Sequence, residues 1–185
     1  MKQAQGFSLI EMAFVLVIIT LLLGGLLVPF TTQVEQRRIA ETNKAMEEIK
    51  EALVGYALVK GRLPCPAKSA SDGSEQDPPC ASIGFLPWGS LGVGKLDAWG
   101  HLYRYAVSPE FADSATPFTF GSNTTLTVQT RNSAGALINL TSSAALPAVI
   151  ISHGKNGYGG TNDDGSAVAA ATSADEITNA TGTNH

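Results

Sequence analysis

A single glutamate interrupts the apolar segment near the N-terminus, and it is the first residue whose type and position suggest chemistry. Glu11 stands in GFSLIEMAFVLVIITLLLGGLLVPF, which runs from Gly6 to Phe30 and contains no other charged side chain. A carboxylate at the centre of a bilayer helix costs about 2.5–3.5 kcal/mol, and each aliphatic residue around it contributes about 0.3–0.6 kcal/mol in the opposite direction. Insertion therefore stays favourable, and the glutamate needs a function that the apolar run does not supply.

Two cysteines are the second candidate for chemistry. Cys65 and Cys80 lie in the proline-rich stretch LPCPAKSASDGSEQDPPC with no histidine nearby, whereas structural zinc requires four ligands. A local disulfide is favoured; closing a loop of about 15 residues contributes roughly 3 kcal/mol in the chain-entropy model. Such a bond implies an oxidising compartment. The alternative is a pair of unpaired surface cysteines in a cytosolic protein.

A glycine-rich stretch at 152–166, SHGKNGYGGTNDDGS, is the candidate ligand site. Side-chain oxygens and turning backbone carbonyls are the ligands that calcium prefers. The candidate calcium ligands are Asn156, Asn162, Asp163 and Asp164. A plain cluster of turns is the alternative. The pair Ser152–His153 does not resemble a nucleophile elbow, so the sequence predicts no catalytic residue and no enzyme.

The elements that must position these residues begin with one long helix. The apolar run at 7–30 corresponds to about 36 Å of helix, which is long enough to cross a bilayer. Residues 31–60 are rich in helix formers, and Gly61 followed by Pro64 predicts where the helix ends. Apolar residues in this second half recur at spacings of three and four and form one stripe: Met46, Ile49, Leu53, Tyr56 and Ala57.

The residues after the cysteine loop predict short strands joined by tight turns. The expected strands are 101–107, 124–129, 136–140 and 147–152. RNSAG, between the second and third, favours a hairpin turn. The expected fold class is α+β, with a long N-terminal helix, its first half membrane-spanning, packed on a small antiparallel β-sheet.

The charge pattern excludes some partners and leaves the membrane orientation in conflict. A net charge of −4 without a basic stripe predicts no direct contact with nucleic acid. Lys2 precedes the apolar run, while Arg37 and Arg38 follow it, so the positive-inside rule opposes a periplasmic body. The cysteines favour the periplasm, and we give them more weight.

The motif GFSLIE, followed by an apolar run of about 20 residues, resembles the N-terminus of type IV pilins and type II secretion pseudopilins. LDAWGHLYRYAV at 96–107 is similar to the segment that opens the sheet of major pseudopilins, and GRLPCPA and VIISHGKNGYGG resemble a pseudopilin-like bacterial group. The resemblance implies that a membrane peptidase cuts after Gly6 and that Phe7 becomes the N-methylated end. Glu11 would be the assembly residue, paired with the N-terminal ammonium of a neighbouring copy. It also implies calcium in a C-terminal loop.

The same resemblance implies a pilin-like organisation and a structural function in a filament. The expected parts are a leader at 1–6, a membrane and filament-core helix half at 7–30, an amphipathic helix half at 31–60, a globular β domain with the Cys65–Cys80 loop at 61–160, and a polar tail at 161–185, either disordered or incomplete.

The implied function is that of a subunit of a type II secretion-like pseudopilus for protein export. The location would be the bacterial inner membrane, single-pass with a periplasmic body, and then the filament. Expected partners are copies of itself or other pilins, a prepilin peptidase, the inner-membrane assembly platform and membrane lipid. Two alternatives stay open: a minor type IV pilin for adhesion, motility or DNA uptake, and an anchored periplasmic binding module that never polymerises.

Overall fold

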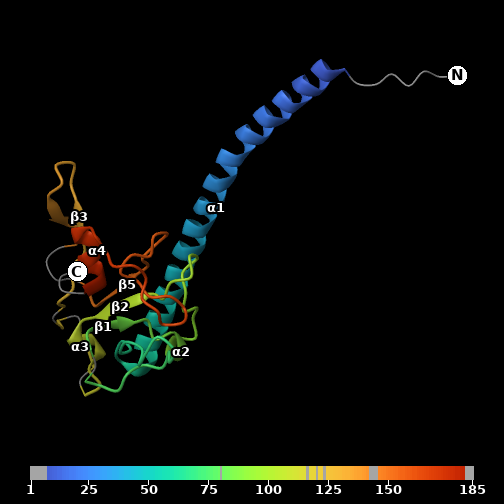
Figure 1. The fold of residues 1–185 in the computed structure, drawn as a ribbon. Helices are drawn as coiled ribbons and strands as arrows, with labels where there is room; N and C mark the ends of the chain where they lie inside the picture. The colour runs from blue at the N-terminus through green and yellow to red at the C-terminus, as the bar shows by residue number, and fades with distance from the viewer. Residues whose placement is uncertain are drawn as a thin grey trace. The chain divides into compact units, whose positions relative to one another are not determined.

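The computed structural model describes residues 8–79, 81–115, 117–119, 121–122, 124–141 and 146–181, without the side chains of 23–30 and Thr181. The chain divides into two compact units, residues 1–40 and 41–185. Helix α1, Leu9–Lys60, contributes to both units (Figure 1).

The first unit contains the N-terminal part of α1, whose apolar side chains are exposed. Between residues 9 and 22 the exposed fraction of the large apolar side chains ranges from 45 % for Ile19 to 89 % for Leu9. Within the residues described, no helix combines the length and the apolar character that a membrane crossing requires. The membrane-spanning role of 7–30 stays a prediction.

In the second unit, α1 ends at Lys60 as the sequence predicts. Gly61 takes a φ of +69°, in the left-handed region that glycine favours, and its N–H donates to the carbonyl of Ala57 at 2.8 Å. The predicted apolar stripe is confirmed, since Ile49 and Leu53 are buried in the core.

A three-stranded antiparallel sheet with the order β1–β2–β5 lies against this stripe. Its strands are β1 (Ile83–Phe85), β2 (Arg104–Val107) and β5 (Ala148–Ile151). In the register, Tyr105 of the central strand lies opposite Gly84 and Ile150. β2 and β5 are shorter than the predicted strands at 101–107 and 147–152, and β1 was not predicted.

The core therefore lies between the second part of α1 and β2. The buried side chains that form it are Ile49, Leu53, Leu63, Cys65, Leu86, Tyr103, Tyr105, Val107 and Ala112. The side chain of Tyr105 is fully buried, and its hydroxyl donates to the carbonyl of Pro64 at 3.1 Å. The single polar atom of this side chain therefore has a hydrogen-bond partner. The α+β arrangement of a long helix with antiparallel sheets is confirmed.

The remaining two strands form a separate sheet. β3 (Gln129–Arg131) and β4 (Leu137–Asn139) pair antiparallel around the predicted hairpin turn, which is confirmed. In that turn the side chain of Asn132 accepts two backbone N–H groups at 3.0 Å each, and Gly135 takes a φ of +80°.

Three short helices complete the described chain: α2 (Trp88–Leu91), α3 (Pro109–Ala112) and α4 (Ala174–Thr181). α4 lies within the polar tail at 161–185, for which the sequence left open disorder or an incomplete chain. Ser173 caps the start of α4: the N–H of Glu176 donates to Ser173 Oγ at 3.2 Å, and that hydroxyl donates to Oε2 of Glu176 at 3.0 Å. Arg131 then holds α4 through two bonds to Asp175, at 2.7 and 2.6 Å.

Candidate assembly site

Ser8 and Glu11 close the first turn of α1. The N–H of Ser8 donates to Oε2 of Glu11 at 2.8 Å, and the N–H of Glu11 lies 3.3 Å from Oγ of Ser8. This reciprocal pair is a capping box, which satisfies two of the N–H groups that a helix start leaves without partners. This capping role was not predicted, although the four residues SLIE have the spacing that signals it.

The other predicted residues of this site lie outside the described residues. Gly6 and Phe7 precede Ser8, so cleavage and methylation between them stay predictions. Glu11 follows Phe7 by four residues, which is about one helical turn. Its side chain is exposed, and in the described part of the chain only Oε2 accepts a hydrogen bond. The carboxylate can therefore accept a second partner while it caps the helix.

The surface around Glu11 consists of apolar side chains along the helix. It carries Leu9, Ile10, Met12, Phe14, Val15, Leu16, Val17, Ile18, Ile19, Leu21 and Leu22, all exposed. A continuous apolar surface of this kind marks a site that lipid or another apolar surface covers. A cation beside Glu11 would be shielded from water in either environment, which strengthens the interaction between the two charges.

The candidate calcium ligands have different partners in the second unit. Asp163 forms an ion pair with the ammonium of Lys95. Asn156 donates from Nδ2 to Oε1 of Glu176 in α4 at 2.7 Å. A calcium ion would have to replace Lys95 on Asp163, and no described bond brings Asn156 to the other three candidates.

The remaining two candidates meet at one turn. Asn162 donates from Nδ2 to Oγ of Ser166 at 3.0 Å, and that hydroxyl donates to Oδ1 of Asp164 at 2.6 Å. The hydroxyl of Ser166, followed by its N–H, lowers the pKa of Asp164. Among the residues described, no three His, Cys, Asp or Glu side chains gather as metal ligands. Calcium binding stays a prediction.

A buried carboxylate anchors the start of this glycine-rich loop. Asp97 is 6 % exposed, and its Oδ1 accepts the N–H groups of Trp99 and His101 at 3.0 and 2.9 Å. Its Oδ2 accepts the hydroxyl of Ser152 at 2.6 Å. Ser152 is therefore part of a structural cluster, and the role of Asp97 at its centre was not predicted.

The same loop is shaped by two imidazoles. A Cβ added to Gly157 would lie 2.5 Å from Nε2 of His101, and one added to Gly160 would lie 3.0 Å from Cγ of His153. The loop therefore needs glycine at both positions. Burial lowers the pKa of His153, and the charges of Arg104 and His101 act in the same direction.

Glu75 holds the cysteine loop against the end of α1. Its two oxygens accept Nη1 and Nη2 of Arg62 at 2.9 and 3.0 Å, the N–H of Cys65 at 3.1 Å, and the hydroxyl of Tyr56. Burial, followed by the bond to Glu75, raises the pKa of Tyr56 to about 12. Cys65 is fully buried, whereas Cys80 lies outside the described residues, so the Cys65–Cys80 disulfide stays a prediction.

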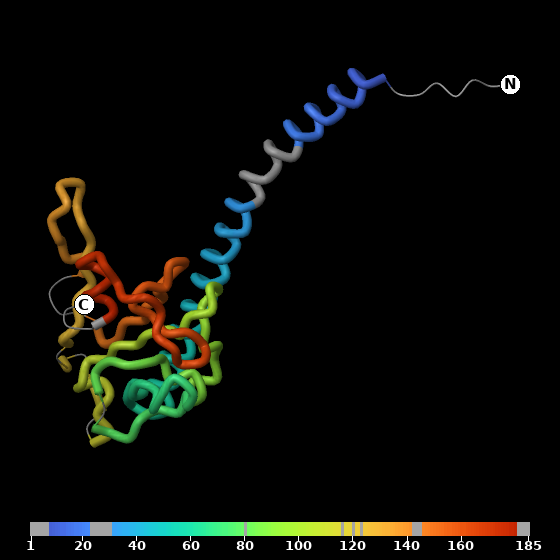
Figure 2. Tube along the Cα trace, in the orientation of Figure 1, coloured from blue at the N-terminus to red at the C-terminus, as the bar shows by residue number. Residues whose placement is uncertain are grey.

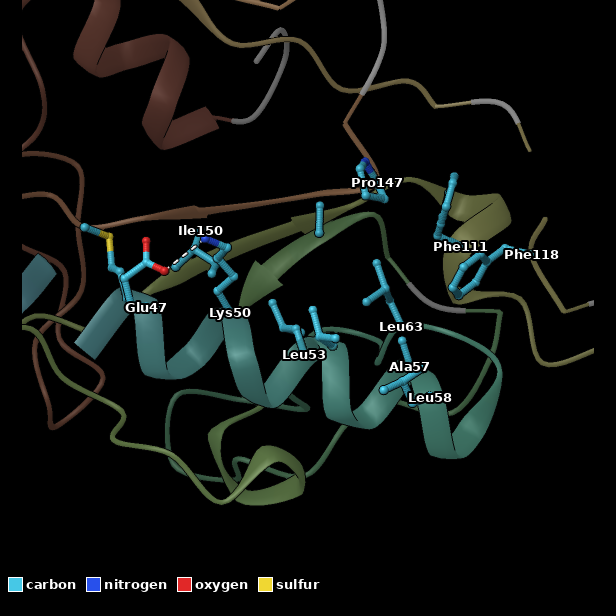
Figure 3. A pocket seen from close by; sticks show the side chains of 13 residues that line it. Glu47, Lys50, Leu53, Ala57, Leu58, Leu63, Phe111, Phe118, Pro147 and Ile150 are labelled. Atoms are coloured by element: carbon cyan, nitrogen blue, oxygen red, sulfur yellow. Dashed lines mark hydrogen bonds and ion pairs between the residues drawn. The ribbon is translucent and has the colours of Figure 1, made fainter. Parts of the chain in front are cut away.

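The second unit also carries an open apolar groove of about 660 Å³ beside α1 (Figure 3). Leu53, Ala57 and Leu58 of the helix form one wall, and Phe111, Phe118, Pro147 and Ile150 lie across from them. Glu47 and Lys50, joined at 2.9 Å, stand at one end. This groove was not predicted, because its walls come from segments far apart in the chain.

Comparison with known proteins places the N-terminus in a class. The chain is an α+β protein whose exposed apolar helix begins at a serine–glutamate cap. Its residues 1–27 match the family model of the prokaryotic N-terminal methylation motif, the hallmark of type IV pilin and pseudopilin precursors. The N-terminus of the chain therefore carries the hallmark of type IV pilin-like precursors, as the resemblance predicted. Comparisons with curated proteins and with solved structures gave no match.

A motif of this class implies, in general terms, processing by a prepilin peptidase and assembly with other pilin-like subunits. It also indicates an N-terminus anchored in a membrane. The matched residues end at residue 27, so the motif says nothing about the cysteine loop, the sheets or the glycine-rich loop.

Proposed function

We propose that this chain is a subunit of a type II secretion-like pseudopilus, a periplasmic filament that serves protein export. The subunit waits in the bacterial inner membrane with its body in the periplasm, is cut after Gly6 and methylated at Phe7, and is then extracted into the filament by an assembly platform. The observation that carries this proposal is Glu11 on the first turn of an exposed apolar helix, within the matched motif.

The mechanism follows from the chemistry of the new N-terminus. Hydrolysis of the peptide bond between Gly6 and Phe7 frees an amine that remains positively charged after methylation. When apolar helices of neighbouring copies replace lipid, the carboxylate of Glu11 needs a cation, and the Phe7 ammonium of the next copy supplies one. Loss of one partner from a buried ion pair costs about 3–5 kcal/mol. The pair therefore sets which copies dock and at what axial position.

Two substitutions separate the charge of Glu11 from its capping role. Glu11→Gln removes the charge, while glutamine still serves at this position of a capping box. Ser8→Ala keeps the charge and removes the serine side of the cap, at a cost of about 1 kcal/mol in helix stability. We expect both variants to be cleaved, Ser8→Ala to assemble, and Glu11→Gln to stay in the membrane fraction.

The readouts are the intact mass of the membrane-extracted protein, which gives the N-terminus, and the amount of chain in sheared filaments. Assembly of Glu11→Gln at the level of the unsubstituted chain would overturn the proposed pairing. Absence of the unsubstituted chain from sheared filaments, with a function that Glu11→Gln leaves unaffected, would favour an anchored module that does not polymerise. A mature chain that begins at Met1 would refute the processing step itself.

A minor type IV pilin is the second candidate, because the matched motif is common to both classes. Substitution of Glu11 would disable either filament. Deletion of the gene separates them: loss of protein export supports the pseudopilin, whereas loss of adhesion, motility or DNA uptake with normal export supports the pilin.

A further inference from the structure

The β3–β4 hairpin is a sheet of two short strands that does not join the three-stranded sheet. In Figures 1 and 2 it projects from the rest of the second unit. An isolated two-stranded hairpin is marginally stable in water, and three or more strands are usually required. β4 is also apolar and open, with Leu137 52 % and Ile138 45 % exposed. The hairpin therefore has the properties of an unfinished sheet.

The bonding pattern shows which backbone groups of β4 are open. The carbonyl of Ala136 and the N–H of Leu140 bond toward β3, at 2.9 and 2.8 Å, and Ile138 is paired with β3 midway between them. Bonding residues alternate along an antiparallel strand, so Leu137 and Asn139 direct their N–H and C=O groups to the outer edge. In the described part of the chain, no backbone hydrogen bond reaches these four groups.

We propose that β4 pairs antiparallel with β4 of a second copy, with the two Ile138 residues opposite each other. Leu137 of each copy then faces Asn139 of the other, and each pair exchanges both of its hydrogen bonds. The product is a four-stranded sheet in the order β3–β4–β4–β3. This pairing uses a surface of the second unit and does not rest on the pseudopilus proposal.

The composition of the edge favours a second copy as its occupant. Residues 136–140, ALINL, contain no charge, so two copies meet without like-charge repulsion. The segment also lacks the lysine or proline that commonly blocks edge pairing. When β4 of one copy pairs with β4 of another, the outward N–H and C=O groups of each strand find partners on the other. The contact is two-fold and self-complementary, the commonest kind between identical chains.

The register is fixed by the same pattern. A shift by one residue would set outward-directed groups of one strand against inward-directed groups of the other. A shift by two would place Leu137 opposite Thr141, or Asn139 opposite Gly135, and both of these lie outside β4. Only in the register centred on Ile138 do Leu137 and Asn139 both pair with residues that also lie in β4.

Disulfide trapping in the full-length chain tests this register. Ile138→Cys places two thiols in a pair without mutual hydrogen bonds, where the Cα atoms are about 4.5 Å apart, within the range for a disulfide. Leu140→Cys is the matched control: it is similarly exposed, but its two copies would lie four residues apart along the strand, about 14 Å. We expect mild oxidation to double the apparent mass of Ile138→Cys on a non-reducing gel, while Leu140→Cys and the unsubstituted chain stay monomeric.

Equal cross-linking of both variants would refute the register, and absence of cross-linking in a folded Ile138→Cys chain would refute the pairing. A second variant gives independent information. Leu137→Pro removes an outward N–H while leaving the bonds to β3 in place, so adding it to Ile138→Cys should abolish the dimer without changing the circular dichroism spectrum.

The N-terminal mass of the same samples distinguishes the two proposals. Dimers formed by a chain still uncut between Gly6 and Phe7 would refute the pseudopilus alone. Normal cleavage without dimers would refute the strand pairing alone.

Discussion

Replacement of Glu75 by alanine removes the carboxylate on which the end of α1 and the cysteine loop converge. Two guanidinium N–H groups of Arg62, the hydroxyl of Tyr56 and the N–H of Cys65 all donate to it. In the sequence, Tyr56 lies just before and Arg62 just after Lys60, the last residue of α1. Glu75 lies within the loop that leads to Cys80. The substitution therefore tests whether this loop is held by the carboxylate.

The magnitude follows from how far the ion pair is buried. The side chains of Arg62 and Glu75 are 15 % and 22 % exposed, so the pair lies between an exposed pair, worth about 0–1 kcal/mol, and a fully buried one, where loss of a partner costs about 3–5 kcal/mol. We expect Glu75→Ala to lower the free energy of unfolding of the second unit by about 3 kcal/mol. At about 2–4 °C per kcal/mol for a unit of this size, Tm falls by about 6–12 °C.

The assay is thermal unfolding of the full-length chain followed by near-ultraviolet circular dichroism, because Trp88 and Trp99 both lie in the second unit. Glu47→Ala is the matched control. It also removes a glutamate from an ion pair, with Lys50 at 2.9 Å, but those side chains are 69 % and 66 % exposed, and the expected loss is below about 0.5 kcal/mol. Equal decreases in Tm for the two variants would refute the reasoning.

The same carboxylate predicts a dependence of stability on pH. Burial acts to raise the pKa of Glu75, but the hydrogen bonds from Arg62, Tyr56 and Cys65 outweigh it, and the pKa is lowered. A lowered carboxyl pKa contributes stability above the unfolded value of about 4.3, which is lost as pH falls through the folded value. Below about pH 4, Tm should therefore fall more for the unsubstituted chain than for Glu75→Gln, and parallel pH profiles would contradict this.

The remaining predictions concern a close contact and the candidate calcium loop. Gly73→Ala would place a Cβ 2.3 Å from the ring of Trp88 and should cost about 1–3 kcal/mol in thermal unfolding, whereas Gly94→Ala, which meets no atom within 4 Å, should cost less than about 0.5 kcal/mol. If calcium binds the loop, Lys95→Met frees Asp163 and should increase the Tm lost on adding a chelator; no effect of chelator on either chain contradicts calcium binding.

The parts of the fold that the sequence predicted are those specified by short-range patterns. The stripe through Ile49 and Leu53 follows from a spacing within one helix, and the β3–β4 turn follows from five consecutive residues. β1 was missed because its three residues, with glycine in the centre, have no strand pattern of their own. It becomes a strand only because Ile83–Phe85 pair with β2, about 20 residues further along the chain.

The same distinction separates the two sites. The N-terminal methylation motif is contiguous, so the first residues alone are enough to single out Glu11 as a candidate. The contact between Asp97 and Ser152 joins positions 55 residues apart, and no local pattern marks a buried carboxylate as the partner of a distant hydroxyl. The tail at 161–185 is a different case: Ser173 and Glu176 have the capping spacing, but the lack of apolar periodicity outweighed it.

The proposed pairing of Glu11 is compatible with its capping role because a carboxylate has two oxygens. The cap uses Oε2, through the N–H of Ser8, and this bond does not require residues 1–6, so it survives removal of the leader. It also limits the directions that the side chain can take, which lowers the entropy lost when a neighbouring ammonium binds to Oε1. On this argument Ser8→Ala should weaken assembly slightly and Glu11→Gln should abolish it. The ratio between the two effects therefore measures how much of the glutamate's function is charge and how much is helix capping.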